Sequence, residues 1–356
     1  MGSRPAGRST RLDVLRAIAA LLVVCMHVKF VPILSAIGWI GVDLFFVLSG
    51  FLISRLLFTE AARAGAIQVG RFYLRRAFKI YAPFWLLLAV TPFILPQPAT
   101  ARQWASELLF LQSYVEGIWG LTWSLAVEEH FYLLLPLLLV VVPPTNYRWA
   151  IPATGALLLF GCTALRYLGV KHLGTGPWDP SPVLRTHVRL DQLFVGVVIG
   201  YWYTCDRNVT KAHLKRLHPI LLTVMAAGLV IVLFAPKQIV LSVGLAVLSV
   251  GFGGVVLTAA CEEPCATGQI ERAMAEVGRS SYALYLWHIP MFVIFSRLSG
   301  LAPNSSALAF TVYAALLILW AIALTRLFED PILAFRDRRF PSTARSAAVR
   351  ASAATA

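Results

Sequence analysis

The feature that most constrains this chain is a series of apolar stretches, each close to the ~20 residues that a helix needs to cross a bilayer. Only 13% of the 356 residues are charged, whereas a soluble domain has about 25%. We therefore predict an all-α polytopic membrane protein with about ten transmembrane helices in one bundle. The predicted spans are residues 12–31, 37–58, 78–96, 124–142, 150–168, 190–205, 219–235, 239–260, 281–298 and 306–328.

The spans divide the chain into three parts. Residues 1–11 are predicted as a cytoplasmic N-terminus, 12–330 as a single ten-span membrane domain, and 331–356 as a cytoplasmic tail. The tail ends in a low-complexity run of Ala, Ser, Thr and Arg, a composition typical of disorder. No cleavable signal peptide is needed to explain the start of the chain.

The net charge of +14 indicates membrane orientation rather than nucleic-acid binding. With the N-terminus placed in the cytoplasm, 23 of the 31 Lys and Arg residues fall in segments on the inner side. This excess is the positive-inside pattern, and it predicts that both termini are cytoplasmic. Membrane lipid is an expected partner, and nucleic acid is not.

The five cysteines predict neither a metal site nor a redox motif. None forms a CxxC pair, and Cys261 and Cys265 have the wrong spacing for a zinc knuckle. We interpret all five as structural and expect no bound metal.

The first span carries Asp13, Arg16 and His27 inside or at the edge of its apolar run. Ionisable side chains are costly in a membrane helix, so they indicate function. The spacing of Arg16 and His27 places both on one helix face within roughly 20°, and separates them by about 16 Å along the axis. One helix thus aligns a fixed cation with a proton-transfer group. A snorkelling arginine and a histidine bonded to a neighbouring helix are the structural alternative.

A second group of cations lies between the second and third spans. Arg75 and Arg76 precede Lys79 by four and three residues, so on a helix the three can converge on one face. A basic cluster beside a membrane commonly contacts anionic lipid. The functional alternative is a clamp for the phosphates of a soluble, anionic donor.

Acidic residues gather where the fourth span begins. Trp123 belongs to a predicted interfacial aromatic belt, and Glu128, Glu129 and His130 follow it. Adjacent helix positions differ by ~100°, so the two carboxylates cannot both point at one site. We expect one to serve a site and the other to support an arginine or the helix start. Simple solvation of both carboxylates is the structural alternative.

Further polar residues lie in the other spans. Asp43 is about a turn and a half into the second span, and Arg189 and Asp191 flank the start of the sixth. Tyr285 and His288 are three residues apart in the ninth span, so one can orient the other. These five, with the aspartate of the first span and the tryptophan of the fourth, are predicted as supporting residues.

Together these placements define two poles that suit transfer of a group across the membrane from a polyanionic cytosolic donor. The outer half holds the acids and bases, and the inner half holds the cations. The outer groups are His27, Asp43, Glu128, Glu129, His130 and Asp191, and the inner groups are Arg16, Arg75, Arg76 and Lys79.

The same residues carry a resemblance to a known family. The chain resembles the membrane acyltransferase 3 family, bacterial O-acyltransferases that modify O-antigens, Nod factors, other glycans and macrolides. The matching stretches are Arg16 through His27, GVDLFFVLSGFLI (41–53), FYLRRAFKI (72–80), WSLAVEEHFY (123–132), RLDQLFVG (189–196) and GRSSYALYLWHIP (278–290), and the resemblance covers about residues 10–330. Six stretches in the same order make a strong match, whereas any one alone is weak.

The resemblance implies an O-acetyltransferase of the bacterial inner membrane. Such an enzyme moves an acyl group, usually acetyl, from cytosolic acyl-CoA to a hydroxyl of a cell-envelope carbohydrate or lipid-linked glycan. Acetyl-CoA is then a substrate, and no permanently bound cofactor is expected. The resemblance also implies a critical histidine at His27, with its arginine at Arg16. The family's basic motif usually ends in a second arginine where this chain has Lys79, which keeps the charge but lacks the bidentate fork.

The expected mechanism gives each group a role. His27 is either the general base on the acceptor hydroxyl or the carrier of the acyl group as an acyl-imidazole, and Glu128 or Glu129 orients the imidazole or stabilises its charged form. Charged hydrogen bonds to the phosphates of acyl-CoA are expected from Arg16, Arg75, Arg76 and Lys79.

Two other functions stay open at the level of the sequence. The acceptor can be an intracellular small molecule such as a macrolide. A proton-coupled carrier or flippase would also use buried His and Glu side chains. A carrier or flippase function leaves the basic cluster aligned with His27 unexplained, and the sequence has no visible inverted repeats.

Overall fold

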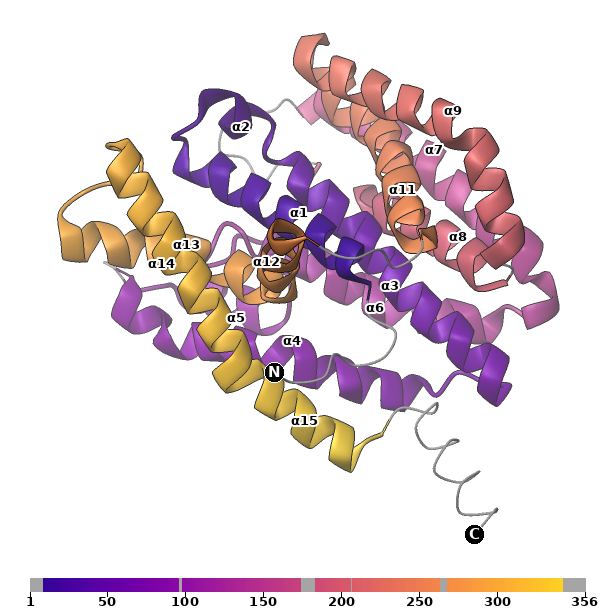
Figure 1. Cartoon of the computed structure of the whole chain (residues 1–356), viewed down its shortest axis with the longest axis horizontal. Helices are drawn as coiled ribbons and strands as arrows, with labels where there is room; N and C mark the ends of the chain where they lie inside the picture. Colours follow the sequence, from indigo (N-terminus) through magenta and orange to yellow (C-terminus); the bar gives the residue numbers. More distant parts are fainter. Residues whose placement is uncertain (1–8, 96–97, 174–182, 206, 263–267, 342–356) are drawn as a thin grey trace.

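The computed structural model describes residues 9–95, 98–173, 183–205, 207–262 and 268–341. Every regular element in these ranges is helical (Figure 1). The α-helices are α1 (Thr10–Val28), α2 (Pro32–Ile37), α3 (Ile40–Ala64), α4 (Val69–Ile94), α5 (Ala101–Leu108), α6 (Trp123–Val141), α7 (Tyr147–Leu173), α8 (Leu190–Cys205), α9 (Arg207–Phe234), α10 (Lys237–Ile239), α11 (Leu245–Cys261), α12 (Gln269–Arg279), α13 (Ser281–Ser299), α14 (Ala307–Leu324) and α15 (Asp330–Arg339). Short 3₁₀ turns η1 (Pro144–Asn146) and η2 (Thr186–Val188) and π-helical turns η3 (Val240–Gly244) and η4 (Thr325–Glu329) join them.

All ten predicted spans coincide with helices. Each overlaps one of α1, α3, α4, α6, α7, α8, α9, α11, α13 and α14. In the described ranges, seven helical segments are long and apolar enough to cross a membrane. Three of the ten helices are outside that set: α1 carries Arg11, Asp13 and Arg16, α8 has only 16 residues, and α13 has polar residues such as His288 and Arg297 among its apolar ones. The chain is an all-α polytopic membrane protein.

The helices form two groups on either side of α1 and α3 (Figure 1). α7, α8, α9 and α11 pack together on one side, and α4, α13, α14 and α15 lie on the other. α1 contacts α11 of the first group and α13 of the second, as well as α3 and α12, so it connects the two groups. The side chains of α1 are therefore surrounded by elements from the whole length of the chain.

α3 and α8 are joined by direct contact between their backbones. A Cβ atom at Gly50 would lie 1.8 Å from the carbonyl oxygen of Leu193, and one at Gly196 would lie 2.3 Å from that of Val47. No side chain fits at those distances, so glycine at both positions permits the approach. This close packing fixes the face of α3 that carries the polar residues described below.

α12 approaches the start of α1 in the same way. A Cβ atom at Gly278 would lie 1.7 Å from the backbone oxygen of Asp13. Asp13 itself is buried. The first turn of α1 is thereby held against the segment that leads into α13.

Large apolar side chains cover the outside of the bundle. Phe93, Phe160 and Phe234 are 84%, 75% and 80% exposed. Such surface is unfavourable in water and favourable against lipid tails. The exposure pattern agrees with a protein embedded in a bilayer.

Two predicted boundaries differ from the structure. The tail predicted as disordered from residue 331 begins instead with α15, which continues to Arg339, and residues 342–356 lie outside the described ranges. α15 packs on α4, where Asp337 pairs with Arg75 and Arg336 donates to the carbonyl oxygen of Arg75, contacts that the sequence alone does not reveal. The connection between the predicted spans 150–168 and 190–205 is also shorter, since α7 extends to Leu173, and residues 174–182 lie outside the described ranges.

Candidate active site

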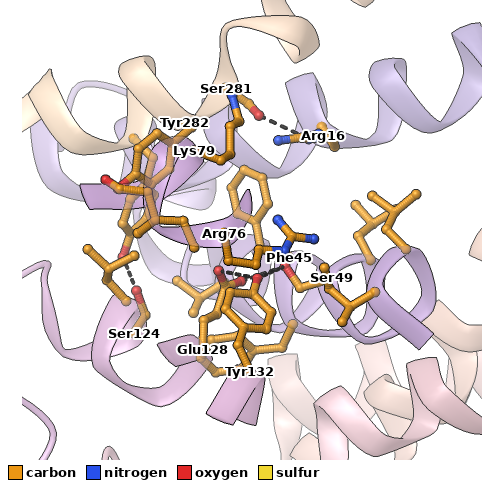
Figure 2. Close-up of a pocket in the computed structure, with 18 residues that line it drawn as sticks. Arg16, Phe45, Ser49, Arg76, Lys79, Ser124, Glu128, Tyr132, Ser281 and Tyr282 are labelled. Atoms are coloured by element: carbon orange, nitrogen blue, oxygen red, sulfur yellow. Dashed lines mark hydrogen bonds between the residues drawn. The ribbon is translucent and has the colours of Figure 1, made fainter. Parts of the chain in front are cut away.

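A cavity of about 170 Å³ lies between α1, α3, α4, α6 and α13 (Figure 2). Charged, hydroxyl and apolar groups share its walls. The lining residues are Arg16, Val42, Phe45, Phe46, Leu48, Ser49, Leu52, Ile53, Arg76, Lys79, Ile80, Ser124, Leu125, Glu128, Tyr132, Ser281, Tyr282 and Tyr285. Five helices, from the first to α13, thus place polar groups around one small volume.

Three of the four predicted phosphate-binding cations line this cavity. Arg16 donates from Nε to Ser281 Oγ at 3.1 Å. The guanidinium of Arg76 lies 5.0 Å from the centre of the Tyr132 ring, within cation–π range. Lys79 is the third cation of the lining. Figure 2 shows Arg16 and Ser281 on one side of the cavity and Tyr132 on the other.

Glu128 is the carboxylate that faces the cavity. It accepts hydrogen bonds from Ser49 Oγ at 2.6 Å and from the Tyr132 hydroxyl at 2.9 Å. Glu129 points elsewhere, beside Tyr81 of α4, and its Oε1 is buried without a partner among the described residues. The two carboxylates diverge as the ~100° step between adjacent helix positions requires.

His27 lies near this cavity but does not line it. Its Nδ1 is 2.9 Å from the carbonyl oxygen of Val23 and 3.2 Å from Nε2 of His288. The two imidazole rings have centroids 4.8 Å apart. Within the described ranges no hydrogen bond joins His27 to Glu128 or Glu129, so the imidazole has a different neighbour from the one expected.

Tyr285 connects the cavity to the pair of histidines. Its hydroxyl is 2.5 Å from Ser124 Oγ and donates to the carbonyl oxygen of Leu121 at 2.9 Å. Its ring lies 5.7 Å from that of His288, and its backbone oxygen is 2.5 Å from His288 Nδ1. Tyr285 therefore orients His288 through the backbone, with its ring on the cavity wall.

Arg75 does not join the other cations. It forms an ion pair with Asp337 of α15 at 2.8 Å and donates to the carbonyl oxygen of Phe340. The predicted convergence of Arg75 with Arg76 and Lys79 is therefore wrong. Neighbouring positions on a helix differ by ~100°, and α15 supplies a carboxylate on the face that Arg75 occupies.

Asp43 and Arg189 form a buried ion pair away from the cavity. Arg189 Nη1 lies 2.8 Å from Asp43 Oδ1, and Gln192 Nε2 donates to the same oxygen at 2.8 Å. The Arg189 guanidinium also lies 5.3 Å from the centre of the Trp123 ring. These three predicted supporting residues thus connect α3, α6 and the start of α8.

Asp191 belongs to a second buried ion pair. Both of its carboxylate oxygens accept from Arg166 of α7, at 2.9 and 2.7 Å. Arg166 also donates to the carbonyl oxygen of Val188 at 2.6 Å. Both side chains are fully buried. The pair joins α7 to α8, and neither residue lines the cavity.

Glu329 is a site residue that the sequence did not single out. Its carboxylate is 2% exposed and pairs with Lys79 at 2.7 Å. Glu329 follows the last predicted span and ends the π-helical turn η4. An acidic residue directly after an apolar span was the available signal, but its partner is 250 positions earlier. The hydroxyls of Ser49, Ser124 and Tyr132 were likewise not predicted as site groups.

Comparison with known proteins gives a consistent assignment. A family model described as an acyltransferase domain matches residues 9–326. "O-acetyltransferase OatA" of Staphylococcus aureus (strain NCTC 8325 / PS 47) is 28% identical over 314 residues, which are 79% of this chain and 50% of that protein. "Peptidoglycan O-acetyltransferase OatA" of Listeria monocytogenes is 26% identical over 350 residues, which are 90% and 55% of the two chains.

A third relative has a similar name. "Putative peptidoglycan O-acetyltransferase YrhL" of Bacillus subtilis is 28% identical over 315 residues, which are 80% of this chain and 48% of that protein. The chain thus spans about half the length of the curated relatives it matches. No solved structure matches it. Because the family model matches most of the chain, this protein belongs to the acyltransferase 3 family.

Proposed function

We propose that this chain is a membrane O-acetyltransferase that transfers an acetyl group from acetyl-CoA to a hydroxyl of a cell-envelope carbohydrate. The observation that carries the proposal is the cavity in which Arg16, Arg76 and Lys79 meet the carboxylate of Glu128. The family assignment supports acyl transfer, and the names of the bacterial relatives support a peptidoglycan-like acceptor.

The cations are proposed to bind the donor. Arg16, Arg76 and Lys79 would form charged hydrogen bonds with the phosphates of acetyl-CoA. A cavity of about 170 Å³ is smaller than the roughly 300–1,000 Å³ of sites that enclose a drug-sized ligand. It is therefore proposed to take the acyl thioester and its narrow arm, with the nucleotide outside the enclosed volume.

His27 is proposed to carry out the proton transfer. In the direct route its imidazole takes the proton of the acceptor hydroxyl, the new C–O bond forms, the C–S bond breaks, and the leaving CoA thiolate receives the proton. In the covalent route His27 itself carries the acetyl group before the acceptor attacks. Radiolabelled acetyl-CoA added without acceptor separates the two, because only the covalent route leaves label on His27.

Glu128 is proposed to organise the wall beside the reacting groups. It holds the hydroxyls of Ser49 and Tyr132 at 2.6 and 2.9 Å, and its negative charge lies in the same cavity as Arg76. A buried carboxylate with two donors keeps its position, so both hydroxyls are presented in one orientation.

The proposed location is the bacterial inner membrane, with both termini in the cytoplasm. The excess of Lys and Arg in the inner segments supports this orientation. Acetyl-CoA then approaches from the cytosol, and the carbohydrate acceptor binds on the opposite side.

The test uses purified full-length protein in detergent with acetyl-CoA and peptidoglycan fragments. The proposal expects release of free CoA thiol over many turnovers only when acceptor is present, together with a base-labile acetyl ester on the carbohydrate by mass spectrometry. Without acceptor, the direct route releases no thiol and the covalent route releases at most one equivalent per protein. Acetyl transfer to a macrolide but not to glycan would move the acceptor to the small-molecule class. Uptake of solute into vesicles without thiol release would indicate a carrier and contradict the enzyme assignment.

A further inference from the structure

The contacts of His27 and His288 determine which ring nitrogens carry hydrogen. His288 Nδ1 lies 2.5 Å from the carbonyl oxygen of Tyr285. A carbonyl oxygen only accepts hydrogen bonds, so this nitrogen must be the protonated one in a neutral ring. His288 Nε2 then carries a lone pair, and it points at His27 Nδ1 at 3.2 Å.

The contacts of His27 also determine which of its ring nitrogens carries hydrogen. Its Nδ1 faces two acceptors, the carbonyl oxygen of Val23 at 2.9 Å and the lone pair of His288. Both contacts require an N–H at that nitrogen. The Nε2 of His27 makes no hydrogen bond to any residue that the structure describes, and the side chain is only partly buried. The unprotonated, available nitrogen of His27 is therefore Nε2.

His288 is held firmly enough to impose this arrangement. It is 1% exposed, and its own carbonyl oxygen accepts from the Tyr313 hydroxyl at 2.7 Å. α13 continues without interruption from Ser281 to Ser299 around it. A buried ring bound at both nitrogens has one orientation, so it can set the orientation of its neighbour.

We propose that His288 is the positioning residue for His27: together with the carbonyl oxygen of Val23 it favours the Nδ1–H tautomer, so that Nε2 is the reacting nitrogen. This inference rests on the proposed acetyl transfer. As the acceptor oxygen attacks the thioester, its proton moves to His27 Nε2, the C–O bond forms and the C–S bond breaks. The proton then passes to the CoA thiolate. During this step the second N–H of the His27 imidazolium stays bonded to the lone pair of His288.

The first test compares His288→Leu and His288→Gln by steady-state kinetics on the full chain. Leucine removes the acceptor, so kcat should fall roughly ten- to a hundredfold, as for loss of one hydrogen bond to a charged group. The KM values for acetyl-CoA and acceptor should stay within about twofold, because His288 touches neither. Glutamine can place an amide oxygen near the position of Nε2 and should restore most of kcat.

Trp287→Phe is the matched control for lost packing. Trp287 is the adjacent residue on α13, 3% exposed, and contacts Trp320 of α14 instead of His27. The Trp287→Phe variant should keep kcat while losing about as much thermal stability as His288→Leu. An unchanged kcat in His288→Leu, or equal losses in the Leu and Gln variants, would contradict the proposal and assign His288 to packing.

A second readout does not depend on acetyl transfer. Diethyl pyrocarbonate modifies unprotonated imidazole nitrogens, and peptide mapping reports the rate at His27. The rate should be several-fold lower in His288→Leu than in the wild type or Trp287→Phe. Equal rates would overturn the positioning role even if the wild type proved inactive toward every acceptor. An inactive wild type with the expected difference in rates would instead reject only the proposed function.

Discussion

At the scale of single residues, the cavity and the histidine pair separate donor binding from proton transfer. The cations Arg16, Arg76 and Lys79 line the cavity, whereas His27 lies beside it and contacts His288. Substitutions in the two groups should therefore affect different kinetic constants.

Replacement of His27 by alanine should abolish most acetyl transfer. General-base catalysis contributes about 10²–10⁴ in rate, so kcat should fall at least a hundredfold. His27 is only partly buried, so the variant should reach the membrane in normal amount and keep its affinity for acetyl-CoA. Thiol release and immunoblots of membrane fractions measure the two effects. A His27→Ala variant with full activity would remove this residue from the mechanism.

Arg76→Ala and Lys79→Ala should each raise the KM for acetyl-CoA. Loss of one charged hydrogen bond is worth about 1.5–3 kcal/mol, or roughly ten- to a hundredfold in affinity. The KM for the acceptor should change little. Arg75→Ala is the internal control, because Arg75 is an equally charged neighbour that pairs with Asp337 instead of lining the cavity. If all three variants behave alike, the cluster serves lipid contact or orientation in the membrane.

At the scale of elements, the segment after α5 is organised by one buried glutamate. Glu107 accepts from the backbone N–H groups of Ile118 and Trp119 at 2.8 and 3.1 Å and from the Thr122 hydroxyl at 2.9 Å. Gly117 packs against it, since a Cβ there would lie 2.6 Å from Glu107 Oε1. This contact sets the path by which the chain enters α6.

The buried glutamate predicts a pH dependence of stability. Burial raises the pKa of Glu107 above its ordinary 4.5, although the hydrogen bonds it accepts act in the opposite direction. The folded state then binds the Glu107 proton more tightly than the unfolded state. The contribution of Glu107 to the free energy of unfolding is therefore complete below pH 4.5 and is lost as pH rises through the raised pKa. Glu107→Gln removes the dependence, and its Tm should vary less with pH over that window.

The comparison needs thermal unfolding followed by tryptophan fluorescence across a pH series. Glu116→Gln is the control, because Glu116 is an exposed glutamate in the same segment. The wild type and the control should have parallel curves, and only Glu107→Gln should be flatter. Three parallel curves would show that Glu107 does not govern the acid–base response.

The positions of the helices could be predicted from the sequence, but most side-chain pairings between helices could not. Apolar runs of bilayer length predict helices because only a helix satisfies its own backbone in lipid. The helical repeat also predicts correctly that Glu128 and Glu129 diverge. It cannot assign Arg75, whose partner comes from α15, or Asp43, whose partner is 146 positions later. Such pairings depend on how helices pack, and no local pattern records them.

At the scale of the whole molecule, the proposal makes a prediction about the two sides of the membrane. Acetyl-CoA enclosed in sealed vesicles of cytoplasmic-side-in orientation should acetylate an acceptor supplied only outside, and the free CoA should stay inside. The reason is that the positive-inside pattern places the basic segments that lead to Arg76 and Lys79 on the inner side. Acetylation that requires donor and acceptor on the same side would contradict transfer across the bilayer.

Orientation can be checked in the same vesicles with an impermeant thiol reagent. In a variant without native cysteines, Ser305→Cys should react from outside and Ala64→Cys only after lysis. Both positions are exposed, so accessibility does not limit the reaction. The reverse labelling pattern would invert the topology and leave the enzyme class unaffected.

The buried Arg166–Asp191 pair has a consequence for how this protein is made. A charged side chain near the middle of a membrane helix adds about 2.5–3.5 kcal/mol to the cost of insertion, and less near the ends. Arg166 and Asp191 belong to consecutive helices, α7 and α8. The ribosome therefore synthesises Arg166 before its partner Asp191. Release of α7 alone would expose the guanidinium to lipid tails, whereas release of the two as a hairpin neutralises both charges at once. The pair therefore links the order of translation to the unit in which these helices enter the bilayer.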